Sequence, residues 1–297
     1  MIQSKTGPLK GFVRLSPSSN EVINKLGPLA GLVGNWNGNQ GWNLIAVPSG
    51  PNGFQLLIEN VSERITFSPV GAPVPNRGGT TEQFVVALLY ELTVIDKSTQ
   101  GVLHVENGMW LNLADVEKQN LGSDSADTPM EFPIARQASV PHGDVIIALG
   151  KAVKSKGTPP IGDINAVPDP GKGAPLGYTD VYFHNDFPQF NAANPNAMLR
   201  QALAGQTIGN VTTLEMDTAN QGGSISNIPF LDQHVKPSDF KCTYWIEDIL
   251  NPDGSIAFQQ LQYSQQTNLN FIKKIEDNGE EGLIMWPHVN VNTLVKE

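Results

Sequence analysis

Residues 239–249 read Asp239-Phe240-Lys241-Cys242-Thr243-Tyr244-Trp245-Ile246-Glu247-Asp248-Ile249. Apolar or weakly polar side chains at 240, 242, 244 and 246 alternate with a second set at 241, 243, 245 and 247, which is the period of a β-strand. Asn251-Pro252-Asp253-Gly254 is a turn sequence, and residues 256–272 alternate again. This stretch predicts two antiparallel strands joined by a tight turn.

The rest of the chain carries the same pattern in shorter pieces. We predict a hairpin of strands 32–38 and 42–47 around a Gly/Asn turn, and further strands at 54–67, 84–95, 101–113, 132–139, 144–151, 211–218 and 284–294. Many short strands joined by tight turns are typical of a meander barrel or a sandwich. The predicted fold class is therefore all-β, an antiparallel up-and-down β-barrel whose interior holds one small apolar ligand.

Three segments interrupt this pattern. Residues 1–25 form a lead-in with a short helix near 19–25, and residues 115–130 are polar and loop-like. Residues 154–238 form a long insertion that begins rich in Gly, Pro, Lys and Asp. Its one helix is expected at 194–204, with Asn194 as the N-cap, Pro195 at the first position and Gly205 as the stop. We predict one domain over 1–297, with the insertion packed outside the barrel.

Composition indicates which kinds of molecule the protein can bind. The 297 residues are 39% hydrophobic and 16% charged, with a formal net charge of −10. An acidic chain lacks the basic surface that nucleic acid and anionic membranes require, and no apolar run is long enough to span a bilayer. A single cysteine, Cys242, forms no internal disulfide, and the first residues lack an apolar signal core, so we expect a cytoplasmic protein. A small-molecule ligand is the expected partner.

Three histidines and one glutamate are candidate functional residues. His288 lies beside Pro287 on the last strand, where it is either an incidental polar residue or a metal ligand. His104 and Glu106 share one face of a strand, which points either into the cavity as a functional pair or to solvent. His142 lies in a Pro-His-Gly turn, where a structural or solvent-exposed role is favoured over a ligand role. His184 and His234 lie in polar loop sequence and are assigned no role.

Common catalytic motifs are missing. The sequence contains no phosphate-binding glycine loop, no Cys-x-x-Cys pair and no Gly-x-Ser-x-Gly elbow. His104, Glu106 and His142 together offer a ligand set for a non-heme metal enzyme, although their spacing over different strands does not test it.

Four collinear stretches resemble the nitrobindin family of heme-binding β-barrels. They are Gly34-Asn35-Trp36-Asn37-Gly38, residues 63–74 with Glu63, Ile65, Phe67, Gly71 and Pro73, His104-Val105-Glu106-Asn107-Gly108, and Pro287-His288-Val289. The resemblance covers about 29–114, 132–151 and 239–294, and the residues after Gly38 depart from the family pattern. The insertion has no counterpart in the short members of the family.

This resemblance implies a ten-stranded, calycin-like barrel, similar to lipocalins and fatty-acid-binding proteins, that holds heme b at its mouth. It implies His288 as the iron ligand through Nε2, His104 on the opposite side as the catalytic residue, and Trp36, Glu106 and Pro287 beside the cofactor. Nitric oxide, peroxynitrite or peroxide would be the ligand. Whether the protein is an enzyme stays open, with peroxynitrite isomerisation and weak peroxidase activity as the reactions, and so does its oligomeric state, a homodimer included. The alternative is a heme-free carrier of a fatty acid or another apolar molecule.

Strand alternation raises one question about His288. An inward His288 sends Val289 and Val291 outward, away from an apolar interior. Either a bulge at Pro287 re-aims the strand, or the insertion covers the outer face of the barrel there.

Overall fold

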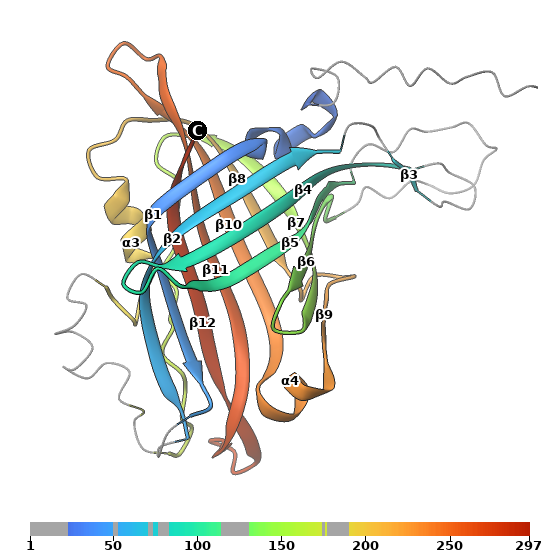
Figure 1. Cartoon of the computed structure of the whole chain (residues 1–297), viewed down its shortest axis with the longest axis vertical. Helices are drawn as coiled ribbons and strands as arrows, with labels where there is room; N and C mark the ends of the chain where they lie inside the picture. The colour runs from blue at the N-terminus through green and yellow to red at the C-terminus, as the bar shows by residue number, and fades with distance from the viewer. Residues whose placement is uncertain are drawn as a thin grey trace, which may run out of the picture.

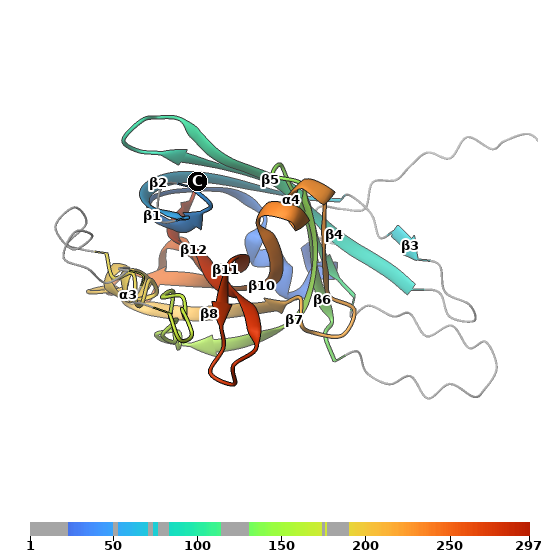
Figure 2. The same cartoon turned by 90° about the horizontal axis from the view of Figure 1, so that it is seen from below.

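The chain forms an antiparallel β-barrel of ten strands in a computed structural model that describes residues 23–49, 53–70, 74–76, 83–113, 131–173, 176 and 190–297. Each of the ten wall strands pairs with the next one along the chain, and the pairing of the last strand with the first completes the ring seen in Figure 2. The up-and-down barrel is therefore confirmed. The wall strands are β1 (Gly34–Val47), β2 (Gln55–Pro69), β4 (Gln83–Asp96), β5 (Val102–Asn112), β6 (Ile134–Val140), β7 (Asp144–Lys156), β8 (Ile208–Asp217), β10 (Lys236–Leu250), β11 (Ile256–Ile275) and β12 (Glu281–Lys296).

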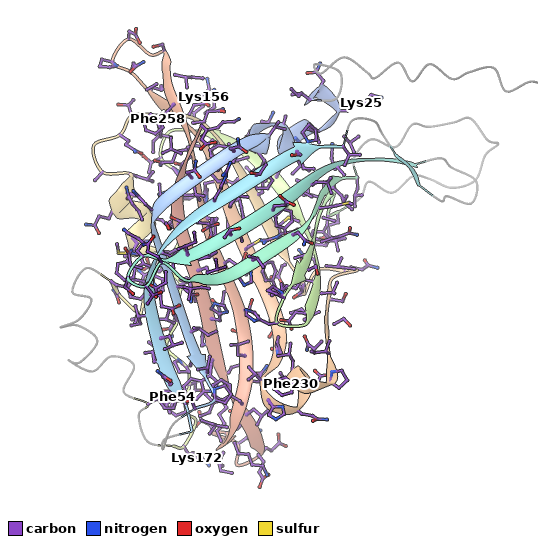
Figure 3. The ribbon with its side chains drawn as sticks, in the orientation of Figure 1. Lys25, Phe54, Lys156, Lys172, Phe230 and Phe258 are labelled. Carbon is purple, nitrogen blue, oxygen red and sulfur yellow. The ribbon has the colours of Figure 1, made fainter. Side chains whose placement is uncertain are left out.

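Short elements decorate the barrel. β3 (Val74–Asn76) extends the pairing of β4, and β9 (Ser224–Asn227) pairs with β7. The 3₁₀ helix η1 (Gly27–Leu32) lies at one end, and α4 (Pro229–His234) lies at the other (Figure 1). Figure 3 shows the same opposition through Lys25, just before η1, and Phe230 on α4. Among the described residues, no helix combines the length and the apolar character needed to cross a bilayer.

Large side chains fill the end of the barrel next to η1. Leu26, Leu29 and Leu32 are fully buried there with Trp36 and Trp110. The alternation predicted on β10 is confirmed, since Phe240, Cys242, Tyr244 and Ile246 share one face and all belong to this interior cluster. Their burial follows from the strand period, which sends alternate side chains to the same face.

β1 is one continuous strand, so the predicted hairpin over 32–47 is wrong. The Gly/Asn segment instead makes a β-bulge, where the register with β12 and β2 shifts between Gly38 and Trp42. Gly38 and Gly41 are needed here because β12 lies too close for a side chain. A Cβ on Gly38 would lie 2.7 Å from the Thr293 carbonyl oxygen, and a Cβ on Gly41 would lie 2.7 Å from the Asn292 side chain. The extra residues reverse which side chains face inward along the strand.

The insertion also differs from its prediction. β7 runs on to Lys156 and β8 lies in the wall between β7 and β10, so these parts of 154–238 do not pack outside the barrel. β8 belongs to the wall because Leu214 and Met216 alternate into the interior core. The helix is shorter than expected: α3 spans Ala197–Ala202 and follows Asn196, because the Asn194 side chain bonds Asp163 and the Ile164 backbone instead.

Other parts of the insertion cover the outer face of the wall, as α3 does in Figure 1. They form a second apolar cluster with outward side chains of β1, β8, β10 and β12, which includes Trp42, Leu44, Ile161, Phe190, Leu199, Leu203, Val211, Trp245, Val289 and Val291. The pairing of β11 with β12 shows no register shift at Pro287. Of the two explanations for an inward His288, coverage by the insertion is therefore correct.

Residues 1–22 and 114–130 lie outside the described part of the chain. The polar loop predicted at 115–130 falls there, and so does most of the helix predicted near 19–25. His184 also lies outside the described residues.

Candidate functional site

A cavity of about 360 Å³ occupies the barrel at the end covered by α4 and β9. Its wall is mainly apolar, and it is capped by Ile225 of β9 and by Leu231 and Val235 at α4. Two further hollows, of about 210 and 420 Å³, lie on the outer wall, and neither is lined by a histidine. The polar side chains that line the cavity are Asn43, Glu59, His104, Glu106, His142, Asp144, Tyr263, Gln265, Thr267, His288 and Asn290.

His288 faces the cavity from β12 and is held by amides. Its Nε2 lies 2.8 Å from Oδ1 of Asn43, which also accepts a hydrogen bond from Asn290 Nδ2 at 2.6 Å. Asn43 in turn donates to Glu59 Oε2 at 2.6 Å. Burial, with a smaller effect of His104 and His142, lowers the pKa of His288 to about 3. The imidazole is therefore neutral at physiological pH.

The hydrogen bonds also determine the tautomer of His288. Asn43 Oδ1 is an acceptor, because its amide nitrogen donates to Glu59, so His288 Nε2 carries the hydrogen. The lone pair of the neutral ring then lies on Nδ1. Binding of iron through Nε2, as the resemblance implies, would first require this hydrogen bond to break.

His104 and Glu106 also face the cavity, so the solvent-facing interpretation of this pair is wrong. His104 Nε2 lies 3.3 Å from Glu106 Oε2, and Arg136 Nη2 donates to Glu106 Oε1 at 2.6 Å. The hydroxyl of Tyr90 donates to the same carboxylate. Burial alone would raise the pKa of Glu106, but Arg136 and His104 outweigh it and lower this pKa to about 2.

Arg136 is the least expected residue of this group. Its side chain is 0% exposed and lies over the rings of Tyr90, Trp110, Phe240 and Tyr244, at 5.1–5.6 Å from their centroids. It also donates to Gln265, which lines the cavity, at 2.9 Å. Arg136 thus fixes the Glu106 carboxylate, which in turn orients His104.

A non-heme metal site of His104, Glu106 and His142 is not formed. The His104 and His142 rings lie 5.5 Å apart, and Glu106 is already used by Arg136. Among the described residues, no group of three or more histidine, cysteine or acidic side chains is arranged to hold a metal ion. The predicted exposure of His142 is confirmed, although its ring also lines the cavity. Partial burial and then His104 lower its pKa.

Two predicted cofactor contacts lie away from the cavity. Trp36 is fully buried on the filled side of the barrel, and its Nε1 donates to Leu32 O at 2.7 Å. Pro287 lies on the face of β12 opposite His288. Neither residue lines the cavity, so this cavity does not support their predicted contact with a cofactor. His234 lies on α4, with Nδ1 2.8 Å from Phe230 O, and does not line the cavity either.

A second buried acid lies beyond the cavity wall. Tyr263, which lines the cavity, donates to Glu63 Oε2 at 2.5 Å, and Asn292 donates to the same oxygen at 2.8 Å. Burial raises the pKa of Glu63 to about 7 despite these two hydrogen bonds. Glu63 was found in the sequence only as part of the second stretch that resembles nitrobindins, and its partners were not indicated because they lie 200 and 229 positions away.

Comparisons with known proteins add little to this geometry. No family model matches the chain, and no curated protein matches it. Among solved structures, the crystal structure of Rv2717c from M. tuberculosis is similar over 93% of this chain and 97% of that chain, with 15% identity and a TM-score of 0.44. Similarity at this level supports no argument about function. The assignment of a function therefore depends on the geometry of the cavity.

Proposed function

We propose that the cavity binds heme b, with His288 as the protein ligand of the iron. One observation carries the proposal: a buried imidazole that stays neutral at physiological pH faces a mainly apolar cavity. A neutral imidazole is the form of histidine that binds iron. The resemblance of four stretches to nitrobindins supports the same assignment.

The cavity offers a ligand for the iron of heme, but its described lining offers no basic partner for the propionate groups. His288 supplies a lone pair, but its Nε2 hydrogen bond to Asn43 must break, or its ring must turn, if Nε2 is to reach the iron. The described lining contains no lysine or arginine, so anionic propionate groups would have to remain in solvent at the mouth. When bound, ferric heme would supply an open coordination position for nitric oxide, peroxynitrite or peroxide.

His104 would be the residue that handles a proton near such a ligand. Glu106 accepts a hydrogen bond from Nε2 of His104, so the neutral ring keeps its lone pair on Nδ1. Because Arg136 keeps Glu106 ionised, the carboxylate can hold the His104 ring in one orientation. Isomerisation of peroxynitrite and weak peroxidase activity are the reactions to which this role applies.

The alternative is a carrier of an apolar molecule without heme. The hydrogen bonds that join His288 and Asn290 to Asn43 favour this alternative, because they hold the imidazole in place without a metal. A fatty acid is a poor candidate in this case, because Arg136 is already paired with Glu106 and no lysine or arginine of the described residues lines the cavity. An uncharged apolar ligand fits better.

Titration of the purified full chain with hemin tests the proposal. We expect a saturable Soret band at one heme per chain in the wild type and in the control His234→Ala, which changes a histidine outside the cavity. His288→Ala should lose or severely weaken heme retention, whereas His104→Ala should keep heme and change its reaction rates with nitric oxide or peroxide. Stoichiometric heme with an unchanged Soret maximum in His288→Ala would show that the ligand assignment is wrong.

We extend the proposal to location and partners. The cytoplasm suits a chain with one cysteine, and Cys242 is buried against Arg136 at 3.3 Å from Nη1. With a net charge of −10, nucleic acid and anionic membranes are not proposed as partners.

A further inference from the structure

The lining of the cavity has an unbalanced negative charge. Three carboxylates line it, and no lysine or arginine of the described residues does. Arg136 neutralises Glu106 from behind the wall at 2.6 Å. Glu59 and Asp144 have no such partner: Glu59 accepts a hydrogen bond from the neutral Asn43, and Oδ1 of Asp144 is buried with no hydrogen-bond partner among the described residues.

The cavity histidines His104, His142 and His288 form no ion pair with Glu59 or Asp144. His288 and His142 both have a lowered pKa, because burial disfavours their charged forms. His104 lowers the pKa of Asp144, but by less than burial and Asp232 raise it, and the Nε2 of His104 lies 3.3 Å from Glu106 Oε2.

Neighbouring acids strengthen the negative potential at both positions. Asp232 of α4 acts on Asp144, and Asp96 acts on Glu59. In each case the neighbour raises the pKa of the lining carboxylate, in addition to the larger effect of burial. Both carboxylates therefore lie in surroundings that already disfavour one more negative charge.

We infer that the cavity selects uncharged small molecules over anions of the same size and shape, and that Glu59 and Asp144 set this selectivity. The physical reason is repulsion between like charges inside a mainly apolar cavity, where water screens them weakly. The inference rests on the proposed use of this cavity as the ligand site. In the heme-bound protein it favours nitric oxide and hydrogen peroxide over anions such as azide, and in a heme-free carrier it favours neutral apolar molecules over fatty-acid anions.

A matched pair of probes tests the selectivity without any cofactor. Naphthamide and naphthoate have nearly the same shape and differ by one negative charge. We expect calorimetric titration of the full chain near pH 8 to show binding of naphthamide, with naphthoate weaker by about tenfold or more, because like charges repel strongly where water screens them weakly.

Charge-neutralising variants assign the effect to residues. Glu59→Gln combined with Asp144→Asn should bring the two affinities to within about threefold of each other, because the repulsion is removed while the side-chain shapes are kept. Asp144→Asn alone, at a half-buried position, should remove part of the difference and serves as the variant least able to disturb folding. Glu91→Gln, an exposed carboxylate on the outer face of β4, is the matched control and should leave the ratio unchanged.

Three outcomes would overturn the inference: equal or tighter binding of naphthoate by the wild type, no binding of naphthamide, or an unchanged ratio in the folded double variant. The hemin titration separates this result from the proposed function. Selectivity between the probes without heme uptake refutes the heme proposal alone, and heme uptake without selectivity refutes this inference alone.

Discussion

Replacing Arg136 by methionine should destabilise the barrel strongly and make its stability depend on pH in a new way. In the wild type, Arg136 and Glu106 form an ion pair of 2.6 Å with side-chain exposures of 0% and 2%. Methionine keeps much of the apolar stem and the contact with the surrounding rings. What it removes is the charge that compensates Glu106.

The magnitude follows from the Glu106 carboxyl. Its pKa falls from 4.5 to about 2, which at 1.36 kcal/mol per unit corresponds to roughly 3 kcal/mol of favourable interaction with the ionised form. Breaking a buried pair by removing one partner costs about 3–5 kcal/mol in other proteins. We therefore expect Arg136→Met to lose about 3 kcal/mol, or roughly 10 °C in Tm for a domain of this size.

The pH dependence has a definite sign. In the wild type this stabilisation is fully present above pH 4.5 and is lost as the pH falls toward 2, because Glu106 is then protonated. In Arg136→Met, burial is no longer outweighed by Arg136, so the pKa of Glu106 rises. The variant should then regain stability as the pH falls through that raised pKa, and its deficit should be smaller near pH 5 than near pH 8.

Urea unfolding followed by tryptophan fluorescence measures both effects. The control is Arg136→Met combined with Glu106→Gln, which removes both charges and should lose less stability than the single variant. A loss below about 1 kcal/mol in Arg136→Met, or an equal deficit at both pH values, would show that the ion pair does not stabilise the fold as argued.

Three further predictions concern single positions. Gly38→Ala should cost about 1–3 kcal/mol in urea unfolding, because its Cβ would lie 2.7 Å from the Thr293 carbonyl oxygen, whereas Gly162→Ala, with open space around its Cβ, should be neutral. The wild type should lose up to about 1.4 kcal/mol per unit as the pH falls from 6.5 toward 3, since His288 stays neutral only in the folded state; a His288→Gln variant should lack this part of the slope in a pH series of unfolding curves. Leu199→Ala should cost about 2–5 kcal/mol, measured by thermal unfolding, because this side chain of α3 is 1% exposed against the outer wall.

Most strands could be predicted from the sequence because alternation reports burial directly. Residues 239–249 and 256–272 fall within β10 and β11, and the set predicted to share one face of β10 points into the barrel. The hairpin over 32–47 failed because Gly and Asn are typical of bulges as well as turns, and the choice depends on whether β12 and β2 lie alongside. β8 was assigned outside the barrel for a similar reason, since local pattern does not reveal which strands share a wall.

The candidate site was predictable only in part. His104, Glu106 and His288 were found because histidine and glutamate are rare on apolar strands, and all three line the cavity. Asn43 was not found, because its contact with His288 joins residues 245 positions apart and depends on register. Arg136 left a signal that was not used: it shares the inward face of β6 with Ile134 and Ala138, where a charge requires a partner.

The bulge in β1 explains why one end of the barrel is filled and the other is hollow. Before the bulge, the large ring of Trp36 points inward and is fully buried in the interior cluster. After it, Asn43, Ile45 and Val47 point inward and line the cavity. Without the reversal, regular alternation would direct Trp42 and Leu44 into this space and send Asn43 away from His288.

The same reversal leaves large apolar side chains on the outer face of the barrel. Trp42 now points outward, where it stacks on Phe190 of the insertion at 4.9 Å. Leu44 and Val289 pair across the outer wall next to it and belong to the same apolar cluster as Leu199. A barrel that turns its large side chains outward to make room for a ligand must cover them again, and the insertion provides that cover. The cavity and the insertion are therefore two consequences of the same bulge at Gly38 and Gly41.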